Sequence, residues 1–152
     1  MRIWRITAKA YATTAFSGLG AQRTGGRFNS VGRKVVYASG SLSLAMLEML
    51  VQAGDRSRLL NHVVLWAALE EDDITRLAPS DLPSDWKALP YRSATQQVGD
   101  KWLDSLKSLA LAVPSVIVPV EWNYLINPDH PDFSKLTPSP PAPAAFDPRL
   151  LV

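Results

Sequence analysis

Short apolar runs separated by polar turns dominate this chain. Residues 35–38, Val-Val-Tyr-Ala, lie between Arg33-Lys34 and a Ser-Gly-Ser segment. A short apolar run flanked by polar residues in this way predicts a strand. Residues 63–69 form a longer apolar run closed by four acidic residues, which predicts a central strand. Further strands are expected at residues 1–6 and at residues 113–120, where prolines favour an edge or a strand end.

Two stretches have helical spacing. The first is expected to begin at the serine cluster after residue 38 and to end near residue 53, before Gly54. The second begins at Ser93-Ala-Thr-Gln, which matches a capping box. The apolar positions of both recur at intervals of about three and four residues: Leu42, Ala45, Met46, Met49 and Leu50 in the first, and Val98, Trp102, Leu106 and Leu109 in the second.

The remaining segments are expected to be loops. Residues 7–34 are rich in small residues and lack sustained periodicity, and a loop of that length usually binds a ligand. Residues 79–92 form a second loop, residues 127–131 a turn, and a proline-rich segment at about 137–148 precedes a last strand. Short strands with two helices and no regular βαβ alternation predict a single α+β domain over 1–152.

Composition excludes several classes of protein. With 47% hydrophobic and 20% charged residues the chain is globular, and with no cysteine it has no disulfide, thiolate metal site or cysteine nucleophile. The first six residues lack the pattern of a signal peptide, and no apolar run reaches the roughly 18 residues of a membrane span. We therefore expect a cytoplasmic protein that does not contact a membrane.

The charges are distributed unevenly. Residues 1–47 contain seven basic residues and no acid, and the first carboxylate is Glu48. A basic first third favours an anionic ligand such as a phosphate or nucleotide, although solvated surface side chains explain it as well.

The segment Gly25-Gly26-Arg27-Phe28-Asn29 is the most informative motif. The glycines allow close approach of a ligand, and an arginine offers a planar fork of donors suited to phosphate. The segment matches neither a Walker A loop nor a dinucleotide-binding fingerprint. A flexible turn with a solvated arginine is the alternative.

Three other side chains are candidates for chemistry. Glu48 overlaps the apolar face of its helix, so its carboxylate is either paired, used, or a boundary residue that reaches solvent. Tyr37 in an aliphatic strand and Ser115 in another each have a purely structural alternative. A Ser–His–Asp hydrolase is disfavoured, because only His62 and His130 are available and Ser115 lacks a nucleophile elbow. No metal site is expected, since the acidic turn around His130 is typical of solvated residues.

In their order and spacing these motifs resemble the RES domain, a family named for its Arg, Glu and Ser. The resemblance covers nearly the whole chain and is weakest at about 134–145. It runs through residues 25–29, 35–39, Leu-Ala-Met-Leu-Glu-Met-Leu at 44–50, Pro-Ser-Val-Ile-Val-Pro at 114–119, Glu-Trp-Asn-Tyr-Leu-Ile-Asn-Pro at 121–128 and Phe-Asp-Pro-Arg-Leu at 146–150.

The resemblance implies a fold related to ADP-ribosyltransferases and the activity of a toxin that depletes NAD⁺. It also implies an Xre-like antitoxin that covers the active site, and a homodimer within the complex. The toxin itself is not expected to bind nucleic acid directly.

On this hypothesis the cleaved bond joins nicotinamide to ribose, and the acceptor is water, phosphate or a protein side chain. Glu48 would stabilise positive charge on the ribose, and Arg27, helped by Arg5, would bind phosphate. Tyr37 would stack on nicotinamide, Ser115 would hydrogen-bond the ribose, and Asn123 would shape the pocket.

Two alternatives remain open at this point. One is a nucleic-acid-binding or RNA-cleaving toxin that uses the basic first third, which lacks a dense basic stripe. The other is a degenerate domain that only binds a partner, although Arg27, Tyr37, Glu48 and Ser115 are all present.

Overall fold

A seven-stranded mixed sheet forms the centre of the protein. The computed structural model describes residues 1–152. Across the sheet the strand order is β4-β5-β6-β2-β1-β3-β7. Strand β4 runs parallel to β5, and all other neighbours are antiparallel. The strands are β1 (Arg2–Ala8), β2 (Val36–Ser39), β3 (His62–Ala68), β4 (Ile74–Arg76), β5 (Ala110–Pro114), β6 (Trp122–Ile126) and β7 (Ala142–Pro143).

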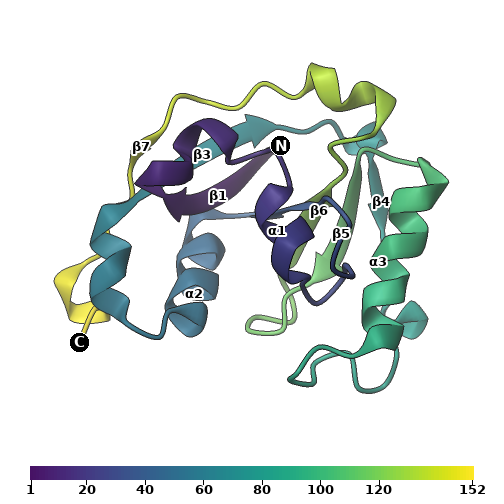
Figure 1. Cartoon of the computed structure of the whole chain (residues 1–152), viewed down its shortest axis with the longest axis horizontal. Helices are drawn as coiled ribbons and strands as arrows, with labels where there is room; N and C mark the ends of the chain where they lie inside the picture. Colours follow the sequence, from purple (N-terminus) through teal and green to yellow (C-terminus); the bar gives the residue numbers. More distant parts are fainter.

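The sheet is accompanied by three α-helices, whose arrangement around it is drawn in Figure 1. Helix α2 follows β2 after two residues and packs against β1 and β2, whereas α3 lies at the β4–β5 end of the sheet. The helices are α1 (Leu19–Thr24), α2 (Leu42–Gln52) and α3 (Ser93–Ser105), and six 3-10 turns lie at Lys9–Thr14, Arg56–Asn61, Glu71–Asp73, Pro79–Asp81, Pro131–Lys135 and Pro148–Leu150. The α+β class predicted from the sequence is confirmed.

The core follows the apolar runs of the sequence. All five residues of β5 are buried, and in β3 buried and partly exposed positions alternate, so that one face of this strand lies in the core. Helix α3 contributes Trp102 and Leu103 to the cluster around Val113 and Leu125. These contacts pack α3 against β5 and β6, and Phe28, from the segment that carries Arg27, belongs to the same cluster.

Four strands or helices of the sequence analysis are confirmed with small shifts of their ends. They are the strand expected at 1–6 (β1), the strand at 35–38 (β2), the helix that ends near 53 (α2) and the strand at 63–69 (β3). Ser41 caps α2, since its side chain accepts a hydrogen bond from the Leu44 amide.

The strand expected at 113–120 is wrong in its extent. Strand β5 ends at Pro114, and the chain then turns before β6 begins at Trp122. The Ser115 hydroxyl accepts hydrogen bonds from the amides of Ile117 and Val118. A side-chain turn of this kind competes with the strand ladder, and the apolar run continues through it.

The capping box expected at 93–96 is not formed. Arg92 is the N-cap residue of α3, and its side chain forms no capping hydrogen bond. The Gln96 side chain instead donates to the carbonyl of Gly26, 70 residues away. The helix ends at Ser105 because Leu106 adopts a left-handed conformation, so the stripe predicted through Leu109 is interrupted.

Two other expectations are corrected. Residues 7–34 contain a 3-10 turn and the six-residue helix α1, which is too short to produce a periodic signal. The strand expected after the proline-rich segment is absent: β7 lies inside that segment, and residues 148–150 form a 3-10 turn. Proline fits β7 because it lies at the edge of the sheet.

Candidate active site

A cleft of about 750 Å³ opens at the sheet beside α2. That volume lies within the usual range of small-molecule sites. Its wall is built by β1, β2, α2, the segment 20–28, the loop 87–91 and the segment 113–117, together with Asn123. The loop of Arg27, distant in sequence from α2, therefore lies in the same cavity as Glu48.

The carboxylate of Glu48 is held by two donors. Its Oε1 atom accepts hydrogen bonds from the Ser115 hydroxyl at 3.0 Å and from Asn123 Nδ2 at 2.6 Å. The Oε2 atom has no hydrogen-bond partner within the protein. Glu48 is half-buried and lines the cleft, so one carboxylate oxygen is fixed and the other is free for a ligand.

Ser115 is fully buried and does not line the cleft. Its oxygen accepts from two backbone amides, and its single proton goes to Glu48. A serine hydroxyl has only one proton to donate. In this geometry Ser115 contacts Glu48 and not the open space.

Tyr37 forms part of the cleft wall, and its hydroxyl points toward the buried Asn29. The hydroxyl donates to Asn29 Oδ1 at 2.7 Å and accepts from the Phe28 amide at 3.1 Å. Burial raises the pKa of Tyr37 well above its usual value, so the side chain is neutral at physiological pH. Gly26 must be glycine here, because a Cβ atom would lie 2.7 Å from the Tyr37 hydroxyl.

The guanidinium of Arg27 is bound by a loop rather than by an acid. Its Nη1 atom donates to the carbonyls of Trp86 at 2.6 Å and Ala88 at 3.1 Å, and its Cζ atom lies 5.0 Å from the centre of the Tyr91 ring. No carboxylate forms an ion pair with it. The positive charge of Arg27 is therefore not neutralised in the cleft.

Arg5 is the second cation of the cleft. It donates to the carbonyl of Ala15 at 2.5 Å and to the carbonyl of Tyr37 at 2.8 Å, and it also lacks an acidic partner. Burial lowers the pKa of Arg5 to about 10. With Lys87 the cleft contains three basic side chains and one carboxylate, Glu48, an arrangement that attracts an anionic ligand.

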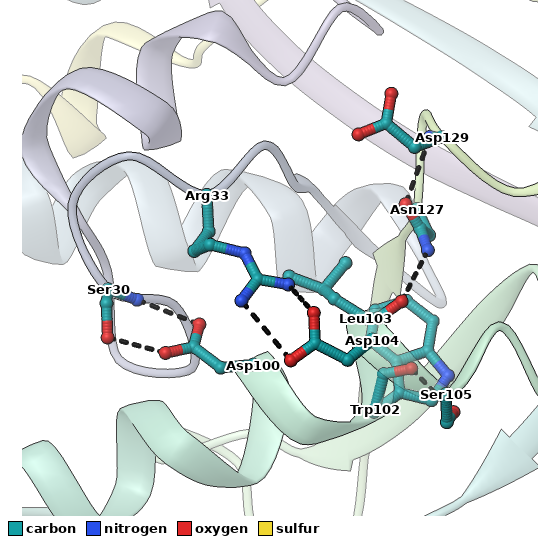
Figure 2. A network of polar contacts seen from close by, with 9 residues as sticks. All are labelled: Ser30, Arg33, Asp100, Trp102, Leu103, Asp104, Ser105, Asn127 and Asp129. Atoms are coloured by element: carbon teal, nitrogen blue, oxygen red, sulfur yellow. Dashed lines mark hydrogen bonds and ion pairs between the residues drawn. The ribbon is translucent and has the colours of Figure 1, made fainter.

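Helix α3 anchors the loop that carries Arg27. Figure 2 shows that Ser30 donates from its amide and its hydroxyl to Asp100, while Arg33 forms an ion pair with Asp104. The two carboxylates are four residues apart and hence neighbours on one helix face. Asn29 is buried within the loop and donates to the carbonyls of Ala21, Ser30 and Arg33.

Five of the six residues singled out from the sequence line one cleft: Arg5, Arg27, Tyr37, Glu48 and Asn123. Ser115 joins them through its contact with Glu48. Sequence reasoning missed Ser39, whose hydroxyl donates to Asn123 Oδ1, and the loop of Trp86 and Tyr91 that holds Arg27. The loop has no motif of its own, and only the fold brings it to Arg27.

The two histidines lie outside the cleft. His62 Nδ1 is 2.9 Å from the carbonyl of Arg58, and His130 caps a 3-10 turn by accepting from the Asp132 amide. No three His, Cys, Asp or Glu side chains are grouped so as to hold a metal ion. None of the helices has the length and apolar character that a membrane crossing requires.

The fold and the site together define the class of protein. It is an α+β domain whose cleft contains arginines and one positioned carboxylate. The RES domain matches residues 2–147, and the chain belongs to this family.

Curated relatives agree with this membership. The chain is 40% identical over 151 residues to "Toxin Res" of Yersinia enterocolitica, covering 99% of each protein. It is 37% identical over 153 residues to "Prs ADP-ribosylating toxin" of a Sphingobium species, covering 97% of this chain and 95% of the relative.

The crystal structure of the M. tuberculosis MbcT–MbcA toxin–antitoxin complex contains a similar fold. The TM-score is 0.74 at 18% identity, with 95% of this chain and 84% of that chain covered. The two chains therefore share a fold, which agrees with the single α+β domain expected from the sequence.

Proposed function

We propose that this protein is the toxin of a toxin–antitoxin pair and that it cleaves the nicotinamide–ribose bond of NAD⁺. The observation that carries the proposal is the carboxylate of Glu48, fixed at one oxygen and free at the other, in a cleft with two unpaired arginines. The names of its relatives, two Toxin Res proteins and an ADP-ribosylating toxin among them, support it.

The reaction requires stabilisation of positive charge. When the bond between ribose C1′ and the nicotinamide nitrogen breaks, both of its electrons stay with the nitrogen. Neutral nicotinamide is released, and the ribose gains oxocarbenium character. The free oxygen of Glu48 would stabilise that charge. An acceptor then attacks C1′ and loses a proton, and this acceptor is water, inorganic phosphate or a protein side chain.

The other residues would bind the substrate. Arg27 and Arg5 supply the donors and charge that a diphosphate requires, and the ring of Tyr37 offers a surface for nicotinamide. Asn123 and the buried Ser115 act through Glu48 in this arrangement. The proposed substrate is NAD⁺, and the proposed chemistry uses no metal.

The proposal extends to partners and location. We propose an Xre-like antitoxin that covers the cleft, since a toxin with an open site requires a neutralising partner, and a homodimer of the toxin within that complex. The proposed location is the cytoplasm, where the NAD⁺ pool lies.

The direct test is nicotinamide release from NAD⁺ by the purified protein freed of any antitoxin. Glu48→Gln keeps the acceptor for Ser115 and Asn123 but removes the negative charge, so we expect turnover to fall at least about 100-fold with folding retained. Glu70→Gln, an exposed glutamate outside the cleft, is the matched control.

The opposite results would end the proposal. An absence of nicotinamide release by the wild-type protein would contradict NAD⁺ cleavage, and unchanged toxicity of Glu48→Gln in cells would remove Glu48 from the mechanism. RNA degradation in cells with intact NAD⁺ would favour the nucleic-acid alternative, which otherwise predicts binding that weakens steeply with salt.

A further inference from the structure

We infer that Ser39 is a positioning residue of the active site, which holds the Asn123 side-chain amide so that its nitrogen faces Glu48. The activity test of this inference rests on the proposed function, whereas its structural test does not. Ser39 is buried and its hydroxyl lies 2.8 Å from Asn123 Oδ1. It is connected to the carboxylate only through Asn123.

The two donors to Glu48 differ in how firmly their direction is determined. The Ser115 oxygen accepts from two backbone amides, so its proton has one remaining direction, toward Glu48. The Asn123 amide has a donor end and an acceptor end, which a rotation of 180° exchanges. Rotated, it would place its oxygen against the Glu48 carboxylate, and two acceptors at 2.6 Å repel each other.

Ser39 completes the favourable orientation. When Asn123 Nδ2 donates to Glu48, Oδ1 faces away and requires a donor, because a partly buried carbonyl oxygen without a hydrogen bond is costly. The Ser39 hydroxyl is the donor to this oxygen. Without the Ser39 hydroxyl, Asn123 Oδ1 has no hydrogen-bond donor, and the side-chain amide becomes free to rotate away from Glu48.

The sheet supplies the geometry of this contact. Ser39 is the last residue of β2 and Asn123 the second of β6, and the two are directly paired across the antiparallel ladder. Opposite residues in such a pair have Cβ atoms about 5 Å apart, within reach of a short hydroxyl and an amide. The backbone register therefore presents Ser39 to Asn123 before any substrate binds.

The test compares Ser39→Ala, which removes the donor, with Ser39→Thr, which retains it. For Ser39→Ala we expect kcat for nicotinamide release to fall about 10-fold with KM for NAD⁺ within twofold, the loss expected from one hydrogen bond. Ser39→Thr is expected to restore kcat. Ser43→Ala, at an exposed serine of α2 whose hydroxyl forms no hydrogen bond, is the control.

A second readout does not depend on activity. In ¹H–¹⁵N spectra the Asn123 side-chain amide is expected to give a dispersed, slowly exchanging pair of signals in the wild-type protein and in Ser39→Thr. In Ser39→Ala these signals are expected to move toward the positions of solvent-exposed amides. If the wild-type protein releases no nicotinamide, the proposed function fails, and these spectra still decide the role of Ser39.

Three results would overturn the inference. They are an unchanged kcat in Ser39→Ala, an equal loss in Ser39→Ala and Ser39→Thr, which would indicate packing rather than a hydrogen bond, and an unchanged Asn123 amide in Ser39→Ala. If Ser39→Ala does not fold, Ser39→Cys, which keeps the shape with a weaker donor, takes its place and must show a partial loss of kcat.

Discussion

Arg27 donates a 2.6 Å hydrogen bond to the backbone carbonyl of Trp86, 59 residues further along the chain. This bond, with the second one to Ala88 and the stacking on Tyr91, attaches the loop at 86–91 to the Gly-Gly-Arg segment. Lys87, Leu89 and Tyr91 of the loop line the cleft. Arg27 thus has two tasks in this fold, since it holds one wall of the cleft and presents a positive charge inside it.

Arg27→Lys tests what the guanidinium contributes beyond its charge. Lysine keeps the charge but replaces the fork of donors by a single ammonium group. We expect KM for NAD⁺ to rise about 10-fold, the equivalent of about 1.4 kcal/mol, and hydrogen exchange in the peptide covering 86–91 to accelerate. Arg23→Lys, an exposed arginine at the end of α1, should change neither quantity. Unchanged exchange at 86–91 in Arg27→Lys would contradict the structural task.

Two glycines near the site should respond oppositely to alanine. At Gly26 a Cβ atom would lie 2.7 Å from both the Tyr37 hydroxyl and Asn29 Oδ1, so we expect Gly26→Ala to lower the free energy of unfolding by about 1–3 kcal/mol. At Gly20, in α1, nothing lies within 4 Å, and alanine should raise it by up to about 1 kcal/mol. Urea unfolding of both variants measures the difference, and equal values would refute the close approach at Gly26.

Ser115→Ala should reduce both stability and turnover. It leaves the amides of Ile117 and Val118 without their acceptor, at a cost of about 1–3 kcal/mol. That corresponds to a fall in Tm of roughly 2–12 °C by calorimetry, against no change in Ser43→Ala.

The double variant Ser115→Ala with Glu48→Gln decides how Ser115 takes part in the reaction. If Ser115 acts through Glu48, as their 3.0 Å contact indicates, the double variant should have the residual turnover of Glu48→Gln alone, because residues that act as a unit are not additive. A further fall in the double variant would show that Ser115 contacts the substrate directly.

Tyr37 should ionise only above the pH at which a tyrosine ordinarily ionises, because burial raises its pKa. Burial raises its pKa in the folded protein above the ordinary value of 10. Below pH 10 both the folded and the unfolded state carry the neutral phenol, and the stability that Tyr37 contributes is fully present. Above pH 10 the unfolded state gains by ionising, so this contribution is progressively lost.

Ultraviolet absorbance of tyrosinate follows this titration. The wild-type protein should show a late ionising step that coincides with alkaline unfolding, and Tyr37→Phe should lack that step. Ionisation of Tyr37 at the ordinary value of 10 would contradict the buried hydrogen bonds of its hydroxyl.

Local pattern was sufficient for much of the fold. The apolar runs at 35–38 and 63–69 and the helix before Gly54 were predicted correctly, because their periodicity reflects which side chains the core buries. The run after Val113 was misjudged, since the Ser115 turn has the same apolar composition as a strand. The stripe beyond Ser105 failed because one left-handed residue, Leu106, ends the helix.

For the site, the sequence by itself determined which side chains are present and that the acid-free first third favours an anion. The motif order pointed to Arg27, Tyr37, Glu48 and Ser115. Only the tertiary structure decided what each side chain contacts: Ser115 faces Glu48 and not the cleft, Arg27 holds a loop, and Ser39 supports Asn123. Such contacts depend on strand register and on the closure of long loops, which bring together residues that local sequence patterns do not connect.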